Sequence, residues 1–141
     1  MDNKTELIKE WIYKAEHDLG MAELALENKP EYTDSICFHC QQTAEKYLKA
    51  YLVFLDIRFE KKHGLSYLLD LINEKEKVAE EFYEIAEKLE DCAVEIRYPD
   101  DWFDPALEEA KESFEVTKKI KGFVLEKITA PIVDNNYKQK E

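Results

Sequence analysis

Two arginines and one histidine are the residues best suited to chemistry on a phosphate ester. Arg58 and His63 are separated by four residues, and Arg97 lies further along the chain. A histidine can move the proton of a ribose 2′-hydroxyl while an arginine stabilises the charged phosphate, so His63 with either arginine suits RNA cleavage without a metal. The alternative is structural, because such spacings also arise by chance and a histidine at a helix start often only caps or packs there.

A second candidate set would bind a phosphate rather than cleave it. Gln42, Lys46 and Lys49 follow spacings of four and three, so on a helix they share one face. Together with Arg97, whose planar guanidinium matches phosphate oxygens, they offer cationic and amide donors. The competing interpretation is a solvated helix face that carries an ion pair between Glu45 and Lys49.

The segment from residue 97 to 104 combines aromatic and acidic residues between two prolines, which predicts a structured loop. A solvated loop needs no large rings. Three aromatic residues are therefore predicted to cover an end of the protein or to contact a partner: Tyr98, Trp102 and Phe103. Asp100 either helps to hold Arg97 for a phosphate or forms a simple ion pair with it that fixes the turn.

The cysteines do not form a recognisable metal motif. Cys37 and Cys40 have a spacing that occurs in zinc sites, but no second pair follows and Cys92 stands alone. We therefore predict no metal and no cofactor, also because the chain has no glycine-rich phosphate loop, nucleophile elbow or His-Glu-x-x-His motif. The odd number of cysteines and the polar start of the chain predict a cytoplasmic protein with reduced thiols.

The charge restricts the partners. Lys+Arg 20 against Asp+Glu 32 gives a net charge of −12. Such a protein is repelled by phosphate backbones, so neither DNA nor an anionic membrane is expected as a partner. A local basic patch would still contact a nucleotide or a short RNA. The strongly acidic stretch 78–96 either repels RNA or docks a basic partner.

Scarce turn residues and a helical apolar periodicity determine the predicted fold. Gly 3 and Pro 4 are too few for a sheet protein of 141 residues, which would need many turns. The periodicity predicts an all-α fold, an antiparallel up-down four-helix bundle with one additional short helix, in a single domain over residues 1–128 followed by a flexible tail over 129–141. The predicted helices are Thr5–Glu27, Thr33–Leu55, a short one from His63 to Ile72, Val78–Ile96 and Pro105–Ile128.

Helix caps and the central helix can also be predicted. Thr5 or Asn3 is expected to cap the first helix, and Asp104 the last one, with Pro105 at its first position. The helix over 33–55 has two apolar stripes, which is typical of a helix with neighbours on both sides. The stripes are Cys37, Cys40, Ala44, Leu48, Tyr51 and Leu55, and Ile36, Thr43, Tyr47, Ala50 and Phe54.

Four segments in this order resemble the HEPN family of bacterial and archaeal proteins over roughly residues 5–128. The most specific is Ser-Ile-Cys-Phe-His-Cys-Gln-Gln-Thr-Ala-Glu-Lys-Tyr-Leu-Lys-Ala at 35–50. The others are Ala-Glu-His-Asp-Leu at 15–19, His-Gly-Leu at 63–65 and Arg-Tyr-Pro-Asp at 97–100. The resemblance implies a helical bundle that forms a homodimer and often pairs with a minimal nucleotidyltransferase in systems of toxin–antitoxin type.

The resemblance also implies an endoribonuclease alternative, because some members cleave RNA without a metal. Their motif is an arginine, four to six residues, then a histidine, at a cleft shared by two subunits. Here the matching arginine is Arg97, but no histidine follows it, and His63 looks like the histidine that opens the short helix in many non-nuclease relatives. We therefore predict a nucleotide- or nucleotidyltransferase-binding module, with an endoribonuclease and a purely structural interaction protein as alternatives.

Overall fold

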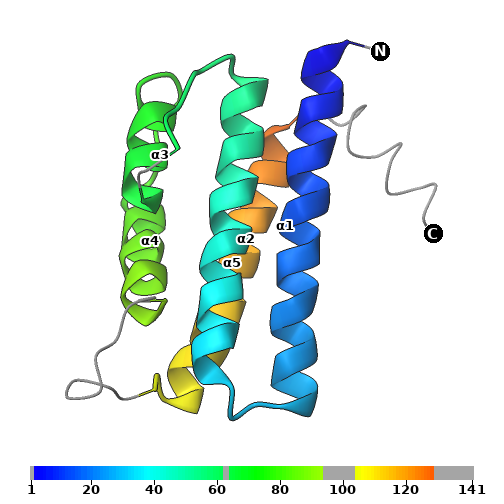
Figure 1. Ribbon diagram of the computed structural model, residues 1–141. Helices are drawn as coiled ribbons and strands as arrows, with labels where there is room; N and C mark the ends of the chain where they lie inside the picture. The colour runs from blue at the N-terminus through cyan, green and yellow to red at the C-terminus, as the bar shows by residue number, and fades with distance from the viewer. Residues whose placement is uncertain (1, 62–63, 94–103, 129–141) are drawn as a thin grey trace.

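The computed structural model describes residues 2–61, 64–93 and 104–128, and over these residues the chain is all-helical without strands. The predicted all-α fold class is confirmed. Residues 129–141, predicted to form a tail, lie outside the described part. The helices are α1 (Asn3–Asn28), α2 (Thr33–Phe54), α3 (Leu65–Asn73), α4 (Glu80–Cys92) and α5 (Leu107–Lys127) (Figure 1).

Helix α2 lies at the centre of the bundle and contacts all four of the other described helices. Figure 1 shows α1 on one side of α2, α3 with α4 on the other, and α5 behind. The long helices α1, α2, α4 and α5 alternate in direction, as expected when short links join neighbouring helices. This is the predicted up-down bundle, and α3 is its additional short helix.

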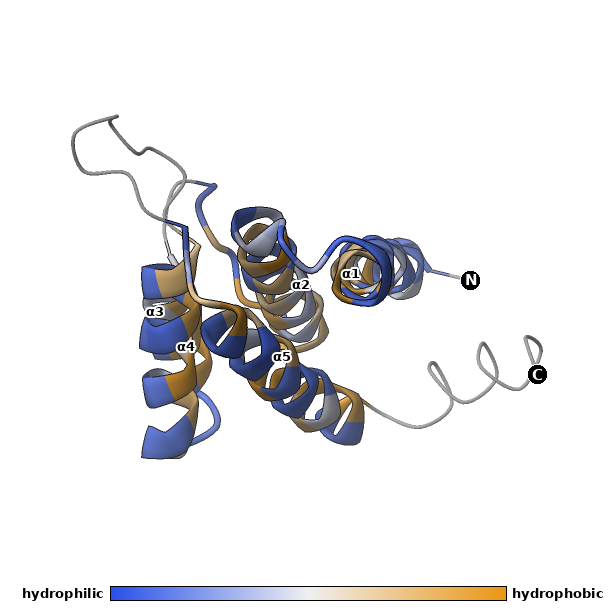
Figure 2. Cartoon of the chain, turned by 90° about the horizontal axis from the view of Figure 1, so that it is seen from below, coloured by the Kyte–Doolittle hydropathy of each residue, from blue (hydrophilic) through white to orange (hydrophobic). Residues whose placement is uncertain are grey.

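The core explains why α2 is central, because both of its predicted apolar stripes are buried. Every member of the two stripes is shielded from solvent except Leu55 and Phe54, which are partly buried. Figure 2 shows the hydrophobic sides of α2, α4 and α5 turned towards one another, with hydrophilic residues outside. Burying a large aliphatic side chain contributes about 1.5–3 kcal/mol before chain entropy is charged, so this interior holds the bundle together.

The first turn of α1 differs from the sequence prediction. Neither Thr5 nor Asn3 caps this helix. Asp2 does, because its Oδ1 accepts a hydrogen bond of 2.6 Å from the backbone N–H of Thr5. That bond lowers the pKa of the Asp2 carboxyl, since it favours the ionised form.

The start of α5 also lies later than predicted. The helix begins at Leu107 rather than at Pro105, and Asp104 is not its cap. Ala106 takes the extended cap conformation, and its backbone N–H donates to the Glu109 carboxylate at 3.1 Å. The backbone N–H of Ala106 is therefore satisfied by a glutamate in the first turn of the helix. The sequence prediction had assigned the capping role to Asp104, an aspartate that precedes the helix.

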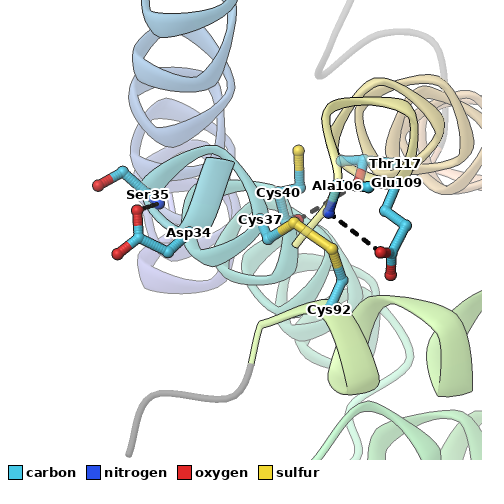
Figure 3. The surroundings of a disulfide bond; sticks show 8 residues. All are labelled: Asp34, Ser35, Cys37, Cys40, Cys92, Ala106, Glu109 and Thr117. Carbon is cyan, nitrogen blue, oxygen red and sulfur yellow. Dashed lines mark hydrogen bonds between the residues drawn. A yellow bond between two sulfur atoms is a disulfide. The ribbon is translucent and has the colours of Figure 1, made fainter. Parts of the chain in front are cut away.

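The cysteines are arranged differently from the prediction of reduced thiols. Cys37 of α2 and Cys92 of α4 form a disulfide, with 5.7 Å between their Cα atoms and a sequence separation of 55 (Figure 3). The prediction was wrong for this pair because cysteine counting does not show which side chains the bundle brings together. Cys40 is the free cysteine, and burial raises the pKa of its thiol to about 12.

None of the described helices has an apolar stretch long enough to cross a lipid bilayer.

Candidate functional site

Two of the predicted phosphate-binding residues of α2, Lys46 and Lys49, lie on the side of the helix that borders α1. Lys46 reaches across to α1, and its Nζ donates a short hydrogen bond to Oδ2 of Asp18. His39 reaches the same carboxylate from about two turns earlier on α2, with Nδ1–H donating to Asp18 Oδ1 at 2.8 Å. Two donors from α2 therefore converge on one acidic residue of α1.

The position of Asp18 explains this convergence. Its neighbours Ala15, Leu19 and Ala22 on α1 are buried, so Asp18 lies on the apolar face of the helix, with a side chain only 10% exposed. A carboxylate withdrawn from water requires charged or hydrogen-bonding partners. The side chains of His39 and Lys46 supply them while staying 24% and 22% exposed, so the cluster is open to solvent on the α2 side.

A second acidic residue of α1 continues the network towards α5. Glu16 Oε2 accepts a short hydrogen bond from the Tyr47 hydroxyl of α2 and forms an ion pair with Lys121 of α5 at 2.9 Å. Polar contacts thus connect three helices along the border of the core. These contacts fix the position of α1 on α2. They therefore also fix where Asp18 accepts the hydrogen bonds of His39 and Lys46.

Lys49 has a different environment from Lys46. It forms the predicted ion pair with Glu45, at 3.0 Å. Its ammonium also lies 5.2 Å from the ring centre of Trp11 and 5.8 Å from that of Phe59, distances suited to cation–π attraction. Lys49 is buried, so this lysine is fixed in place beside two rings rather than extended into solvent.

Gln42 lies at the far end of the same side of α2 and joins a third set of contacts. Its amide donates to Gln41 at 2.8 Å, and Gln41 donates to Glu90 of α4 at 3.2 Å. Glu90 also accepts the backbone N–H of Leu65, at 2.8 Å. Gln42 is therefore tied to the junction of α2, α3 and α4, whereas the two lysines face α1.

The ion pairs of Lys46 and Lys49 restrict how these two lysines can bind an anion. Each lysine already has a carboxylate partner, so a phosphate at this surface has to displace a carboxylate or share the ammonium. Lys46 is the better placed of the two, because it is more exposed and has His39 on the same carboxylate. The cluster of Asp18, His39 and Lys46 is the candidate site.

Several predicted site residues fall outside the described residues, and for them the assignments stay predictions. Arg58 is described and is exposed in the link after α2. The catalytic and phosphate-binding candidates that are not described are His63, Arg97 and Asp100. The partner-interface candidates that are not described are Tyr98, Trp102 and Phe103.

The sequence prediction missed Asp18 and His39 as members of a site. The signal that would have found them is an aspartate at an inward-facing position of the first helix, between Ala15 and Ala22. A charge on an apolar stripe needs a partner from the adjoining helix.

The order of these helices, and the motif segments on α1 and α2, can be compared with known proteins. A sequence profile described as the HEPN domain matches residues 8–128. The chain belongs to the HEPN domain family. The HEPN assignment covers every described helix except the first five residues of α1, so the family and the bundle describe the same unit.

A solved structure supports the same assignment. The HEPN protein is similar to the crystal structure of an archaeal HEPN homologue, with a TM-score of 0.69 and 28% sequence identity. The match covers 86% of this chain and 98% of the homologue. The comparison with curated proteins gives no match.

Proposed function

We propose that this HEPN protein is a binding module that holds a nucleotide, or a nucleotidyltransferase partner, at the side of α2 that borders α1. The observation that supports the proposal is the convergence of Lys46 and His39 on Asp18, with both donors partly exposed. Asp18 holds the ammonium and the imidazole close together without any ligand. A phosphate that approaches from the α2 side meets two donors that are already positioned.

The arginine loop completes this proposal through the family resemblance. Arg97 belongs to the Arg-Tyr-Pro-Asp segment that carries part of the resemblance, and arginine is the strongest phosphate ligand type in this chain. Gln42 and Lys49 would complete the surface as an amide donor and a cation. With its net charge of −12, the protein needs such a local cluster to attract an anion at all.

Calorimetric titration with nucleoside mono-, di- and triphosphates tests the ligand. We expect one nucleotide class to bind, and Lys46→Gln and Arg97→Ala each to weaken it by roughly tenfold, the typical loss of a charged hydrogen bond. The matched control is Lys111→Gln, because Lys111 is an exposed lysine of α5 far from the cluster in sequence. Absence of heat with every nucleotide would remove the nucleotide part of the proposal.

The partner part has a separate test. Co-expression with the nucleotidyltransferase encoded beside the gene, where one is present, followed by size-exclusion chromatography, should give a complex that Lys46→Gln weakens. A complex that survives Lys46→Gln and Arg97→Ala unchanged would place the partner elsewhere. Growth arrest by one protein and its relief by the other would establish a toxin–antitoxin pair.

A homodimer is proposed because one outer face of α1 carries large apolar side chains. Tyr13, Met21 and Leu24 are separated by eight and three residues, so they lie on one side of the helix, and each is 41–66% exposed. Contiguous exposed apolar side chains mark interaction surfaces. Light scattering should report a dimer for the wild type and a monomer for Tyr13→Ser/Leu24→Ser, with Leu107→Ser on α5 as control.

A further inference from the structure

A groove at the start of α4 has a lining that the proposed nucleotide site does not use. It lies between this end of α4 and the last part of α5, and the two helices run side by side (Figure 2). It encloses about 560 Å³, within the roughly 300–1,000 Å³ of pockets that hold small molecules. Lysines and phenylalanines make up most of its lining: Lys77, Lys119, Lys127, Phe82 and Phe123.

The two phenylalanines provide apolar surface in this groove. Phe82 of α4 and Phe123 of α5 contact each other, with 4.5 Å between their ring centres, and both are only partly buried. Phe123 also meets the buried ring of Tyr51 edge-on, at 5.7 Å between ring centres, which holds it in place. Fixed rings that the chain leaves partly uncovered suit a flat apolar group, because aromatic rings pack well on one another.

The three lysines of the groove are poorly compensated by the chain itself. Lys119 forms one long ion pair, at 3.8 Å, with Glu81 of α4. For Lys77 and Lys127, no carboxylate in the described part of the chain comes within ion-pair distance. Glu81 and Glu126 are the acidic residues of the lining, so positive charge is in local excess in a chain of net charge −12. Such a local excess attracts an anion.

Gly122 is an independent sign that the groove holds a ligand. It lies in the interior of α5, where glycine is the weakest helix former after proline. The fold does not require a glycine here, because its φ is not positive and a Cβ would meet no other part of the chain within 4 Å. A glycine without either reason leaves the backbone bare in the lining of the groove, where a ligand can approach it closely.

We propose that this groove binds a small molecule that carries a flat aromatic ring and an acidic group. The ring packs on Phe82 and Phe123 beside the bare backbone of Gly122, and the acidic group pairs with the lysines. A neutral ligand would leave the lysines unused, and an inorganic anion would leave the rings unused. The groove shares no residue with the cluster of Asp18, His39 and Lys46, so the proposal does not depend on the nucleotide site.

Nuclear magnetic resonance titration of the isotope-labelled full chain with phenylacetate, at low ionic strength, tests the proposal. We expect saturable shifts confined to the amides of 77–82 and 119–127. Benzyl alcohol and acetate should each bind at least about fivefold more weakly, because the first lacks the charge and the second lacks the ring. Equal binding of acetate, or shifts outside these two segments only, would overturn the proposal.

Gly122→Leu fills the groove without straining the helix. The substitution should raise the midpoint of urea unfolding, because leucine is a better helix former than glycine, and should abolish the phenylacetate shifts. The matched control is Gly20→Leu in α1, where a Cβ also meets nothing within 4 Å. This control should raise the midpoint in the same way and leave phenylacetate binding unaltered. Unchanged binding in a stably folded Gly122→Leu would overturn the proposal.

The charge of the ligand is tested separately. Lys77→Gln/Lys127→Gln should weaken phenylacetate binding by roughly fivefold, which is modest because both lysines are exposed. Lys111→Gln/Lys118→Gln removes the same charge from exposed lysines of α5 outside the groove, and should change the affinity less than about twofold. Equal weakening by the two double substitutions would mean that net charge alone attracts the anion, and would overturn the site.

Discussion

At the scale of single residues, Asp18 shows how one buried charge organises its surroundings. It faces the core side of α1, and two side chains of α2 turn towards it. Asp18→Ala should lower the free energy of unfolding by about 1–3 kcal/mol, because it leaves a half-buried lysine and histidine without their partner. Urea denaturation followed by circular dichroism measures this change.

The control for Asp18→Ala is Glu23→Ala, an exposed acidic residue on the same helix, which should change the free energy of unfolding by less than about 0.5 kcal/mol. Equal effects of the two substitutions would mean that the contacts of Asp18 with His39 and Lys46 contribute little to stability. The nucleotide titration would then be the better test of what those contacts do.

The cysteines give a prediction that needs only thiol counting. The native protein should react with no equivalent of an alkylating reagent at pH 8, since Cys40 is buried and the other two cysteines are paired. One thiol should react after denaturation without reductant, and all three after reduction. Two or more reactive thiols in the unreduced denatured protein would contradict the disulfide.

The pH dependence of Cys40 has a definite sign. Burial raises the pKa of its thiol from 9.0 to about 12, so folding favours the protonated form. The resulting contribution to stability is complete below pH 9 and is lost as the pH rises towards 12. Reaction of the native protein should therefore stay slow at pH 10, where an exposed cysteine is largely thiolate.

At the scale of helices, α3 depends on a residue from α4. Glu90 accepts the first backbone N–H of α3, from Leu65, and so takes the place of a side-chain cap. A Cβ at Gly64 would lie 3.1 Å from the same carboxylate oxygen, so the close approach needs a glycine or a shift of Glu90. Helix α3 has 9 residues, too few to be stable alone.

Glu90→Ala should therefore destabilise α3 by about 1–2 kcal/mol, the usual effect of losing a helix cap. Hydrogen exchange should show faster opening of the amides of 65–73, with little change in α1. Glu87→Ala, one turn earlier on the exposed side of α4, is the matched control and should leave the exchange of α3 unaltered. Protection of α3 that is equal in both variants would mean that packing alone holds this helix.

The helices could be predicted from the sequence because their signals are local. The start of α2 at Thr33 was predicted to the residue, and its end at Phe54 to within one. The caps were less predictable, since Asp2, Asn3 and Thr5 are all good capping residues and only the backbone geometry selects Asp2. The cap of α3 was not predictable at all, because Glu90 lies 25 residues from Leu65 in sequence.

At the scale of the whole molecule, the same distinction applies to the candidate site. The spacing of Lys46 and Lys49 predicted a shared face correctly, but it could not show that Lys46 meets Asp18, 28 residues earlier, while Lys49 stacks on Trp11. Local spacing tells which residues share a helix face, and only the packing of α1 on α2 decides what that face contacts. The disulfide was missed for the same reason.

The disulfide belongs to the whole molecule because it joins the central helix to the end of α4 across 55 residues. A cross-link over a loop of that length stabilises a protein by about 2–4 kcal/mol, chiefly by restricting the unfolded chain. Reduction of the wild type should therefore lower its free energy of unfolding by that amount, and its unfolding midpoint in urea in proportion. The replacement Cys37→Ser/Cys92→Ser should lower it at least as far, because it removes the same bond and places two hydroxyls where buried sulfurs were.

Sensitivity to reductant provides the internal control for this last prediction. Dithiothreitol should shift the midpoint of the wild type and leave that of Cys37→Ser/Cys92→Ser unchanged, since Cys40 cannot form the bond alone. The difference between these two responses isolates the disulfide from any packing loss that the serines cause. If reductant left the wild-type midpoint where it was, the link between α2 and α4 would rest on side-chain packing rather than on a covalent bond.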